Sequence, residues 1–398
     1  MHKIERLLQT LAPKGVEFRK LGEVINILKG KQLNKELLLD YGEYPVMNGG
    51  IYASGYWNEY NTDCPKIIIS QGGASAGYVN YMTSKFWAGA HCYTIELNSE
   101  KLNYKFLYYF FKNSQTILMK SQFGAGIPAL NKADIETLTI PIPPLEIQQE
   151  IVKILDAFTE LNTELNTELK ARKKQYEYYQ NMLLDFNDIN SNHQDAKERL
   201  TQKTYPKPLK SLLQTLAPKG VEFRKLGEVC DFQKGKSITK KAVTFGKVPV
   251  ISGGRQPAYY HNEANRSGET IAISSSGVYA GYVSYWDIPV FLADSFSVSP
   301  KQKTLMPKYL FHYLTTQQDA IHATKSTGGI PHVYSKDLQN FLIPIPPLEI
   351  QQEIVKILDQ FSILTTDLLA GIPAEIEARK KQYEYYREKL LTFKPLKA

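Results

Sequence analysis

The sequence predicts an α+β protein built as an internal tandem repeat, in which two similar mixed α/β modules are joined by two long helices. Three observations predict this class. Long blocks recur unchanged, the divergent interiors between them keep their turn residues, and each repeat ends in a block with coiled-coil spacing of apolar residues. The chain has 398 residues, which is long enough for two or more hydrophobic cores.

The recurring blocks set the repeat length. They are LLQTLAPKGVEFRKLGEV at residues 7–24 and 212–229, IPIPPLEIQQEIVKILD at 140–156 and 343–359, and ARKKQYEYY at 171–179 and 378–386. Their offsets of 205, 203 and 207 residues define one unit of about 200 residues, which is within the usual length of a domain.

Between these blocks the two interiors differ in most side chains but still align at turn residues. The matched positions are Lys-Gly-Lys at 29–31 and 234–236, Gly-Gly at 49–50 and 253–254, Ala-Gly-Tyr-Val at 76–79 and 280–283, and Gly-Ile-Pro at 126–128 and 329–331. Random drift would scatter changes through the helices as well. A constant scaffold around divergent interiors therefore favours two readers of two different targets.

The interiors are rich in strand signals. Short β-branched or aromatic runs closed by Gly, Ser and Asn predict strands at 67–69, 77–81 and 271–273, and short helices are expected at 104–112 and 308–314. Each interior, residues 16–144 and 221–347, is thus expected to form a compact α+β module.

Each repeat then continues into a long amphipathic helix. Proline pairs at 143–144 and 346–347 suit a first helical turn, and Glu146 and Glu349 suit its positive end. Apolar residues come next in alternating steps of four and three, which is coiled-coil spacing. They are Ile147, Ile151, Ile154, Phe158, Leu161 and Leu165, and in the second repeat Ile350, Ile354, Ile357, Phe361, Leu364 and Leu368.

The first helix is expected to reach about Leu184, whereas Pro373 should kink or interrupt the second helix. Two such helices can bury their stripes against each other, most simply as an antiparallel pair with one module at each end. The expected domains are a first module at 1–145, the first helix at 146–186, a polar linker at 187–211, a second module at 212–348 and the second helix at 349–392.

Composition narrows the class of protein further. With 43% hydrophobic and 22% charged residues the chain is globular, and its net charge of +8 suits a polyanionic partner, although only modestly. Cys64, Cys92 and Cys230 give neither a disulfide framework nor a zinc spacing. The sequence contains no run of about 18 apolar residues, so no segment is expected to span a membrane. The cysteine pattern makes a reducing, cytoplasmic location the expectation.

The sequence lacks the common catalytic motifs. There is no N/D-P-P-Y/F, G-x-S-x-G or HExxH sequence. Gly235-Lys236-Ser237 resembles the end of a phosphate-binding loop, but Cys230 stands where that loop requires glycine. His91 and Cys92 are adjacent, so on a strand they would point to opposite faces. We therefore predict no catalytic and no metal-ligating residues.

Taken together, the paired blocks resemble the specificity subunit of a type I restriction–modification system, and the resemblance covers essentially the whole chain. It implies that each module is a target-recognition domain that reads one half of a split double-stranded DNA sequence. It also implies that the helices set the distance between the halves and dock two copies of a methyltransferase subunit, with a nuclease/translocase subunit as an optional partner. S-adenosylmethionine and ATP would bind those partners, so this chain is expected to need no cofactor.

Residues 159–170 read TELN-TELN-TELK, three copies of a four-residue unit inside the first helix. Four residues lengthen a helix by about 6 Å and rotate it by about 40°, close to the twist of one base pair. A solvated helix face would use the same residue types. Together with the resemblance, however, the repeat favours a spacer that sets the distance between the half-sites.

The candidate DNA contacts lie in glycine-rich loops and their flanking lysines, since base reading needs donors and acceptors and phosphates need cations. They are Lys29, Lys31, Asn48, Ser70, Gln71, Ser75 and Tyr78 in the first module, and Lys234, Lys236, Ser252, Arg255, Ser275, Ser276, Tyr279 and Tyr282 in the second. For any one of them, an ordinary turn or solvated position is equally compatible with the sequence.

The unchanged helical blocks are better explained by a constant partner, or by contact between the two helices themselves. The candidate partner-binding residues are Gln148, Gln149, Arg172, Lys173 and Tyr176, and in the second repeat Gln351, Gln352, Arg379, Lys380 and Tyr383. The alternative function is a scaffold whose two modules bind proteins or carbohydrate instead of DNA.

Overall fold

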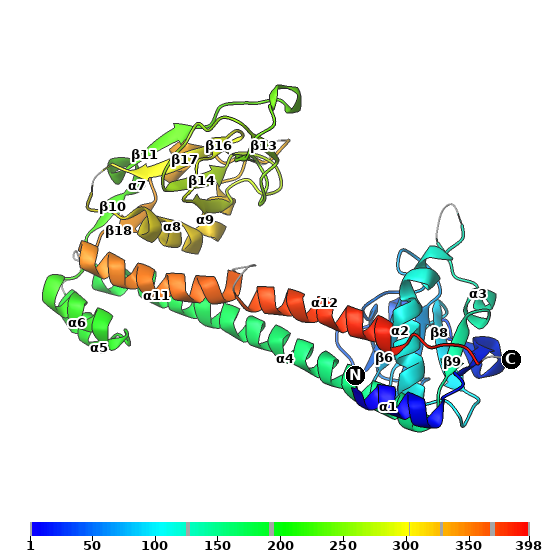
Figure 1. Cartoon of the computed structure of the whole chain (residues 1–398). Coiled ribbons are helices and arrows are strands. Elements are labelled where there is room, and N and C mark those ends of the chain that lie inside the picture. Colours follow the sequence, from blue (N-terminus) through cyan, green and yellow to red (C-terminus); the bar gives the residue numbers. More distant parts are fainter. Residues whose placement is uncertain are drawn as a thin grey trace. The chain divides into compact units, whose positions relative to one another are not determined.

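The computed structural model describes residues 2–124, 128–190, 195–301, 303–326, 329–366 and 371–396. The chain divides into two compact units, one formed by Met1–Asn166 with Glu375–Ala398 and the other by Thr167–Ala374. Each unit contains one mixed module together with parts of both long helices (Figure 1). The predicted domain boundaries separate module from helix, whereas the compact units divide within the helices.

The first module combines small sheets with short helices. A four-stranded antiparallel sheet has the order β2-β8-β5-β6, a three-stranded sheet the order β4-β3-β7, and β1 pairs with β9. The elements are α1 (His2–Leu11), β1 (Glu17–Lys20), η1 (Leu21–Glu23), β2 (Ile25–Lys29), η2 (Lys35–Leu37), β3 (Tyr44–Met47), β4 (Gly55–Trp57), β5 (Lys66–Ser70), β6 (Val79–Met82), β7 (Trp87–Ala88), β8 (Cys92–Leu97), α2 (Tyr104–Lys120), α3 (Lys132–Glu136) and β9 (Thr139–Ile142).

The second module repeats this topology, with sheets β11-β17-β14-β15, β13-β12-β16 and β10-β18. The elements are α6 (Lys207–Leu216), β10 (Phe223–Lys225), α7 (Leu226–Val229), β11 (Cys230–Lys234), η4 (Lys240–Ala242), β12 (Val248–Ile251), β13 (Tyr259–His261), β14 (Thr270–Ser274), β15 (Val283–Trp286), β16 (Phe291–Leu292), β17 (Ser295–Pro300), α8 (Pro307–Thr316), α9 (Gln318–Ala323), α10 (Ser335–Leu338) and β18 (Leu342–Pro344). The predicted α+β class and the tandem repeat are confirmed.

The predicted short helices of the modules are present. The first is longer than expected, because α2 continues to Lys120 from an Asn103 cap whose side chain accepts hydrogen bonds from Lys105 N and Phe106 N. The predicted strands at 67–69 and 271–273 lie within β5 and β14. The strand expected at 77–81 starts later, at Val79, because Gly77 has a φ of 85° that a strand does not allow.

The long helices agree closely with the sequence pattern. Helix α4 (Leu145–Leu184) has 40 residues and ends at the predicted position. The second long segment is interrupted as predicted, since α11 (Leu348–Thr366) ends before α12 (Ile372–Leu390), and Pro373 lies in the first turn of α12. The predicted stripe positions Leu364 and Leu368 lie outside the part of the chain whose side chains are described.

In the first unit, the beginning of α4 packs against the module and against the end of α12. Ile147, Ile151 and Leu155 are fully buried in one core with Leu390. In the same unit Phe158 stacks on Tyr386 of α12, with ring centroids 5.6 Å apart. The first turns of one long helix therefore meet the last turns of the other, which is the expected antiparallel pairing.

The second unit repeats this packing with the roles of the helices exchanged. Ile350 and Ile354 of α11 are fully buried in one core with Leu183 of α4, and Tyr179 stacks on Phe361 at 5.1 Å. The stripe differs from a simple coiled-coil seam, because its ends face the modules as well as the other helix. Further along α4, Leu161 is 44% exposed, so the prediction that it is buried is wrong.

The segment 187–211, expected to be a polar linker, contains η3 (Asn187–Ile189), α5 (Ala196–Gln202) and the start of α6. It folds because Leu200, Tyr205 and Leu209 are buried in the core of the second unit. After the first long helix, Ile189 O accepts a hydrogen bond from Val221 N at 2.8 Å.

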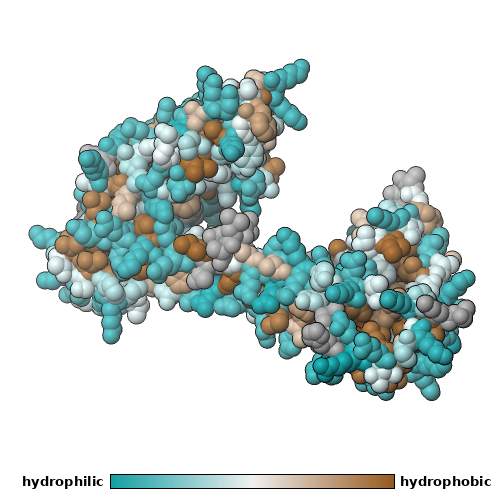
Figure 2. All heavy atoms as spheres, in the orientation of Figure 1, coloured by the Kyte–Doolittle hydropathy of each residue, from teal (hydrophilic) through white to brown (hydrophobic). Residues whose placement is uncertain are grey.

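On the face seen in Figure 2, hydrophilic side chains predominate and apolar ones are scattered. None of the helices in the described residues has both the length and the apolar composition needed to cross a membrane.

Candidate nucleic-acid interface

In each module, loops from separate parts of the sequence gather at the end of one sheet strand, β5 or β14. We call this group the loop cluster. It comprises residues 48–51, 71–78, 89–91 and 128–131 in the first module, and 252–255, 275–282, 293–294 and 331–334 in the second.

The backbone connections of the two loop clusters match one for one. Gln71 N donates to His91 O at 2.9 Å, as Ser275 N donates to Asp294 O at 3.0 Å. In the same way, the amide of Gly73 donates to Pro128 O at 2.8 Å, and that of Gly277 donates to Pro331 O at 3.0 Å. The same hydrogen-bonded backbone framework is thus built twice.

Matched glycines make this framework possible. Gly73 and Gly277 have φ values of 82° and 85°, and Gly77 and Gly281 have 85° and 86°. A Cβ added at Gly77 would lie 2.7 Å from the carbonyl carbon of Leu118. The turn therefore needs glycine both for its backbone angle and for its close approach to α2.

The side chains carried by the framework differ between the modules. The hydrogen-bond pattern makes Asp294 the counterpart of His91, and both are exposed. The other differing pairs, first module before second, are Ile51 and Arg255, Gln71 and Ser275, Gly72 and Ser276, Ser75 and Tyr279, Ala129 and His332, and Asn131 and Tyr334. The same backbone therefore offers different donors, acceptors and shapes.

The structure brings most of the predicted DNA contacts to this surface. Gln71, Ser75, Tyr78, Ser275, Ser276, Tyr282, Asn48 and Ser252 are partly exposed, while Arg255 and Tyr279 are exposed. Ser70 does not lie on this surface, contrary to the prediction, because it is buried and its hydroxyl donates to Gly50 O at 3.4 Å. Its counterpart Ser274 donates to Ser252 O at 3.2 Å, so this serine position holds two loops together.

The four predicted phosphate-binding lysines lie on strand β2 or β11 or directly after it. Lys29, Lys31, Lys234 and Lys236 are all exposed, and among the described residues none forms an ion pair. Their ammonium groups are therefore available to an anion from solution.

Sequence reasoning missed part of the second loop cluster. A cavity of about 390 Å³ lies beside Lys234 and Ser275, both of which were predicted, and its wall also contains Asp294, His332 and Tyr334, which were not. The rings of His332 and Tyr334 stack at 5.9 Å. Aligning the two repeats through their shared Ile-Pro pair would have identified this divergent position.

The adjacent pair His91 and Cys92 is not a ligand pair. Cys92, the first residue of β8, is buried, whereas His91 lies in the preceding turn and is exposed, so the two side chains do not share one environment. Burial raises the pKa of the Cys92 and Cys230 thiols to about 12, so both stay protonated at neutral pH. Within the described residues, no three His, Cys, Asp or Glu side chains are arranged to hold a metal ion.

Two predicted partner contacts are wrong. Gln148 and Gln351 are fully buried at the starts of α4 and α11. The Gln351 amide donates to Thr304 O and Pro346 O at 2.8 and 2.7 Å and accepts from Met306 N at 2.9 Å. Gln148 makes the equivalent bonds in the first module, so both glutamines fix a helix to its own module.

We expect Gln351→Ala to lower the free energy of unfolding by about 1–3 kcal/mol, because buried backbone groups lose their partner. The exposed neighbour Gln352 provides a matched control, and Gln352→Ala should stay within about 0.5 kcal/mol of the unchanged protein. Denaturant unfolding measures both variants. Equal effects of the two substitutions would show that the buried bonds contribute nothing specific.

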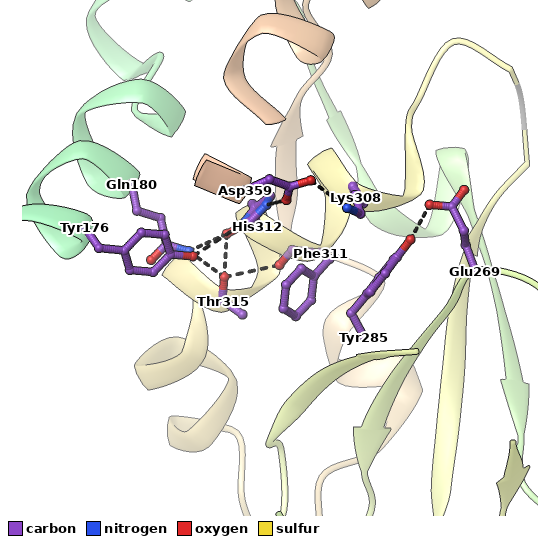
Figure 3. A network of polar contacts seen from close by, with 9 residues as sticks. All are labelled: Tyr176, Gln180, Glu269, Tyr285, Lys308, Phe311, His312, Thr315 and Asp359. Atoms are coloured by element: carbon purple, nitrogen blue, oxygen red, sulfur yellow. Dashed lines mark hydrogen bonds and ion pairs between the residues drawn. The ribbon is translucent and has the colours of Figure 1, made fainter. Parts of the chain in front are cut away.

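A polar network joins the second module to both long helices (Figure 3). The Asp359 carboxylate of α11 accepts from Lys308 Nζ at 2.6 Å and lies 3.0 Å from His312 Nε2 on α8. From α4, Tyr176 OH lies 3.4 Å from His312 Nδ1, and Gln180 donates to His312 O at 3.2 Å. Burial alone would raise the pKa of Asp359, but the hydrogen bonds from His312 and Lys308 bring it below its ordinary value.

The first module has the matching junction with different chemistry. Asp156 accepts from Lys105 Nζ at 2.8 Å and from Tyr109, which takes the place of the histidine. Arg387 of α12 donates to Asn113 Oδ1 at 3.3 Å. Aspartates in an unchanged block thus anchor each module to its helices.

The remaining partner candidates divide between the inside and the outside of the helices. Tyr176 and Tyr383 are partly buried, and their rings pack against the module cores, which leaves little of each ring for a partner to contact. Arg172 and Arg379 are partly exposed, and each pairs with a glutamate four residues before it. Gln149, Lys173, Gln352 and Lys380 are exposed.

Two copies of one loop-bearing module, each fixed to long helices by the same anchors, define a duplicated recognition protein. The family model described as the type I restriction modification DNA specificity domain matches residues 13–174 and 218–378. The chain belongs to this family.

Similar proteins agree with this assignment over the full length. A Haemophilus influenzae protein assigned as a type I restriction enzyme specificity subunit is 33% identical over 409 residues, covering 98% of each chain. The Escherichia coli EcoR124I/EcoR124II specificity subunit is 29% identical, covering 99% of this chain and 97% of that one. The crystal structure of the type I restriction–modification S subunit from M. genitalium shares the fold, with a TM-score of 0.65, 24% identity and coverage of 95% and 96%.

Proposed function

We propose that this chain reads the DNA target of a type I restriction–modification complex, with each module reading one half of a bipartite, asymmetric sequence. The observation that carries the proposal is the loop cluster, in which one backbone framework occurs twice with different side chains. Constant loops position the readers, and divergent side chains select different bases. The exposed lysines at its edge suit phosphate contacts.

The unchanged helical blocks suit a partner that is the same for both halves. Two equivalent sets of exposed residues, Gln149 with Lys380 in the first unit and Gln352 with Lys173 in the second, would dock two copies of a methyltransferase subunit. A nuclease/translocase subunit is an optional further partner. We propose that S-adenosylmethionine and ATP bind those subunits and that this chain contributes recognition without catalysis.

We expect the purified chain to transfer no methyl group to DNA and to do so only when a methyltransferase subunit of the same system is added. The partner would flip the target base and supply the catalytic site, since this sequence has no N/D-P-P-Y/F motif. Incorporation of labelled methyl groups into DNA measures the activity. Activity of the highly purified chain alone would refute the non-catalytic role.

The same preparation separates DNA reading from the scaffold alternative. Specific DNA binding should weaken steeply between about 50 and 200 mM salt, because phosphate contacts release counterions. Absence of DNA binding by the assembled complex, together with capture of a glycan or protein, would favour the scaffold instead.

A further inference from the structure

Arg255 is held in an unusual position at the surface of the second loop cluster. It directly follows the Gly253-Gly254 turn and is exposed. Its guanidinium carbon lies 4.9 Å from the ring centroid of Tyr279 and 5.6 Å from that of Tyr282. Two aromatic faces thus restrict the plane of the guanidinium before any ligand binds.

The hydrogen-bonding capacity of this group remains unused. Among the described residues, Arg255 donates no hydrogen bond and forms no ion pair, so its five N–H donors face solvent or a ligand. A cation–π contact occupies the face of the guanidinium and leaves its edge free. Such an arrangement presents a pre-oriented donor fork.

In the first module a different cation lies against the matching tyrosine, and it bonds within its own module. There, Lys112 lies 4.2 Å from the centroid of the Tyr78 ring, the counterpart of Tyr282. Its ammonium donates to Val79 O and Gln115 Oε1, both at 2.9 Å. Burial, aided by the charge of Arg387, lowers the pKa of Lys112 to about 8. Lys112 therefore stabilises its own module, whereas Arg255 is free to act outward.

An acceptor lies in the same loop cluster. The exposed Asp294 carboxylate accepts a hydrogen bond from the Ser276 hydroxyl. A Cβ added at Gly253 would be 3.8 Å from Asp294 Oδ2, which places the carboxylate beside the turn that carries Arg255. A negative charge there disfavours a phosphate as the ligand of Arg255 and favours a base edge, which offers both acceptors and donors.

We infer that Arg255 is the residue through which the second module reads a guanine, with its guanidinium edge donating to the O6 and N7 acceptors of that base in the major groove. This bidentate pairing is the commonest specific contact between arginine and a base pair. The first module has Ile51 at the matched position, so its half-site is not read by this contact. The inference rests on the proposed function.

The test maps methylated sites made by the complete complex with wild-type chain, Arg255→Ala, Arg255→Lys and Lys236→Ala. The wild-type second half-site should contain a guanine, and Arg255→Ala should lower discrimination at that single position by about 10- to 100-fold. Arg255→Lys should also relax this position, because lysine lacks the planar fork. Lys236→Ala, a phosphate-contact control, should weaken methylation at all sites without changing the sequence.

Different results would contradict the role of Arg255 and the proposed function. An unchanged second half-site in both Arg255 variants would overturn the inference. Equal weakening of methylation at all sites by Arg255→Ala, with recovery in Arg255→Lys, would also overturn it, because that result indicates a phosphate contact. Continued reading of the first half-site shows that the variants are folded. A wild-type complex that methylates no bipartite sequence would overturn the proposed function itself.

Discussion

Replacement of residues 221–347 by the matching segment of another family member changes the second half of the DNA target completely and leaves the first half intact. This result is expected because the divergent side chains of each loop cluster come from a single module. The core beneath the second loop cluster, including Ile271, Ile273 and Phe296, belongs to the second unit alone. Each reader is therefore structurally complete within its own unit.

The ends of the exchanged segment suit such a replacement. Strands β10 and β18 pair antiparallel, with Phe223 opposite Pro344, so the two junctions lie close together. Val221 N keeps its bond to Ile189 O, and the anchor Gln351 lies outside the exchange. The incoming module therefore meets the same helix surface as the original one.

Mapping methylated sites in cells that also carry the partner genes measures the result. Exchange of residues 16–144 is the reciprocal control and should change only the first half of the target. If either exchange altered both halves together, the two modules would not be independent readers.

The repeat explains why so much of the fold could be predicted from one sequence. The unchanged blocks defined the repeating unit, and the proline pairs indicated where the long helices begin. The apolar spacing predicted that the first helix continues to Leu184, as observed. The same logic failed at Leu161 and in the segment 187–211. In both places burial depends on which surface is packed nearby, and periodicity does not contain that information.

The loop cluster was predictable as a region but not residue by residue. Glycines at matched positions indicated the turns, because many of them, such as Gly77 and Gly281, have a positive φ that other residues rarely adopt. His332 and Asp294 were not predicted as site residues, because they belong to loops that are far apart in the sequence and meet only in the folded module. Gln148 was misjudged because an unchanged residue can serve an internal anchor as well as a partner. Distinguishing these roles requires burial and hydrogen-bond partners.

Deletion of residues 163–166, one complete TELN unit of α4, should leave both half-sites readable and shorten the gap between them by one base pair. The repeats at 159–170 span the point, between Asn166 and Thr167, where the two compact units divide within one continuous helix. Removing four residues shortens that helix by about 6 Å and rotates its C-terminal part by about 40°.

The deletion should cost little stability. Thr163 Oγ1 donates to Thr159 O, and Asn166 Nδ2 donates to Asn162 O, so these side chains bond to their own helix. The next unit, Thr167 to Lys170, restores the same pattern. The change in free energy of unfolding should therefore stay near the range of about ±0.5 kcal/mol that is usual for surface substitutions.

Rotation and translation predict different gaps, and the difference makes the test sharp. The rotation of about 40° matches one base pair, whereas a shift of about 6 Å matches nearly two at about 3.4 Å each. We give rotation more weight, because a module must face its groove to reach base edges, while an inclined helix can absorb some length. Methylated sites of the deletion variant should keep both half-sequences and lose one intervening base pair. An unchanged gap, or altered half-sites, would show that the repeat is an ordinary solvated helix face.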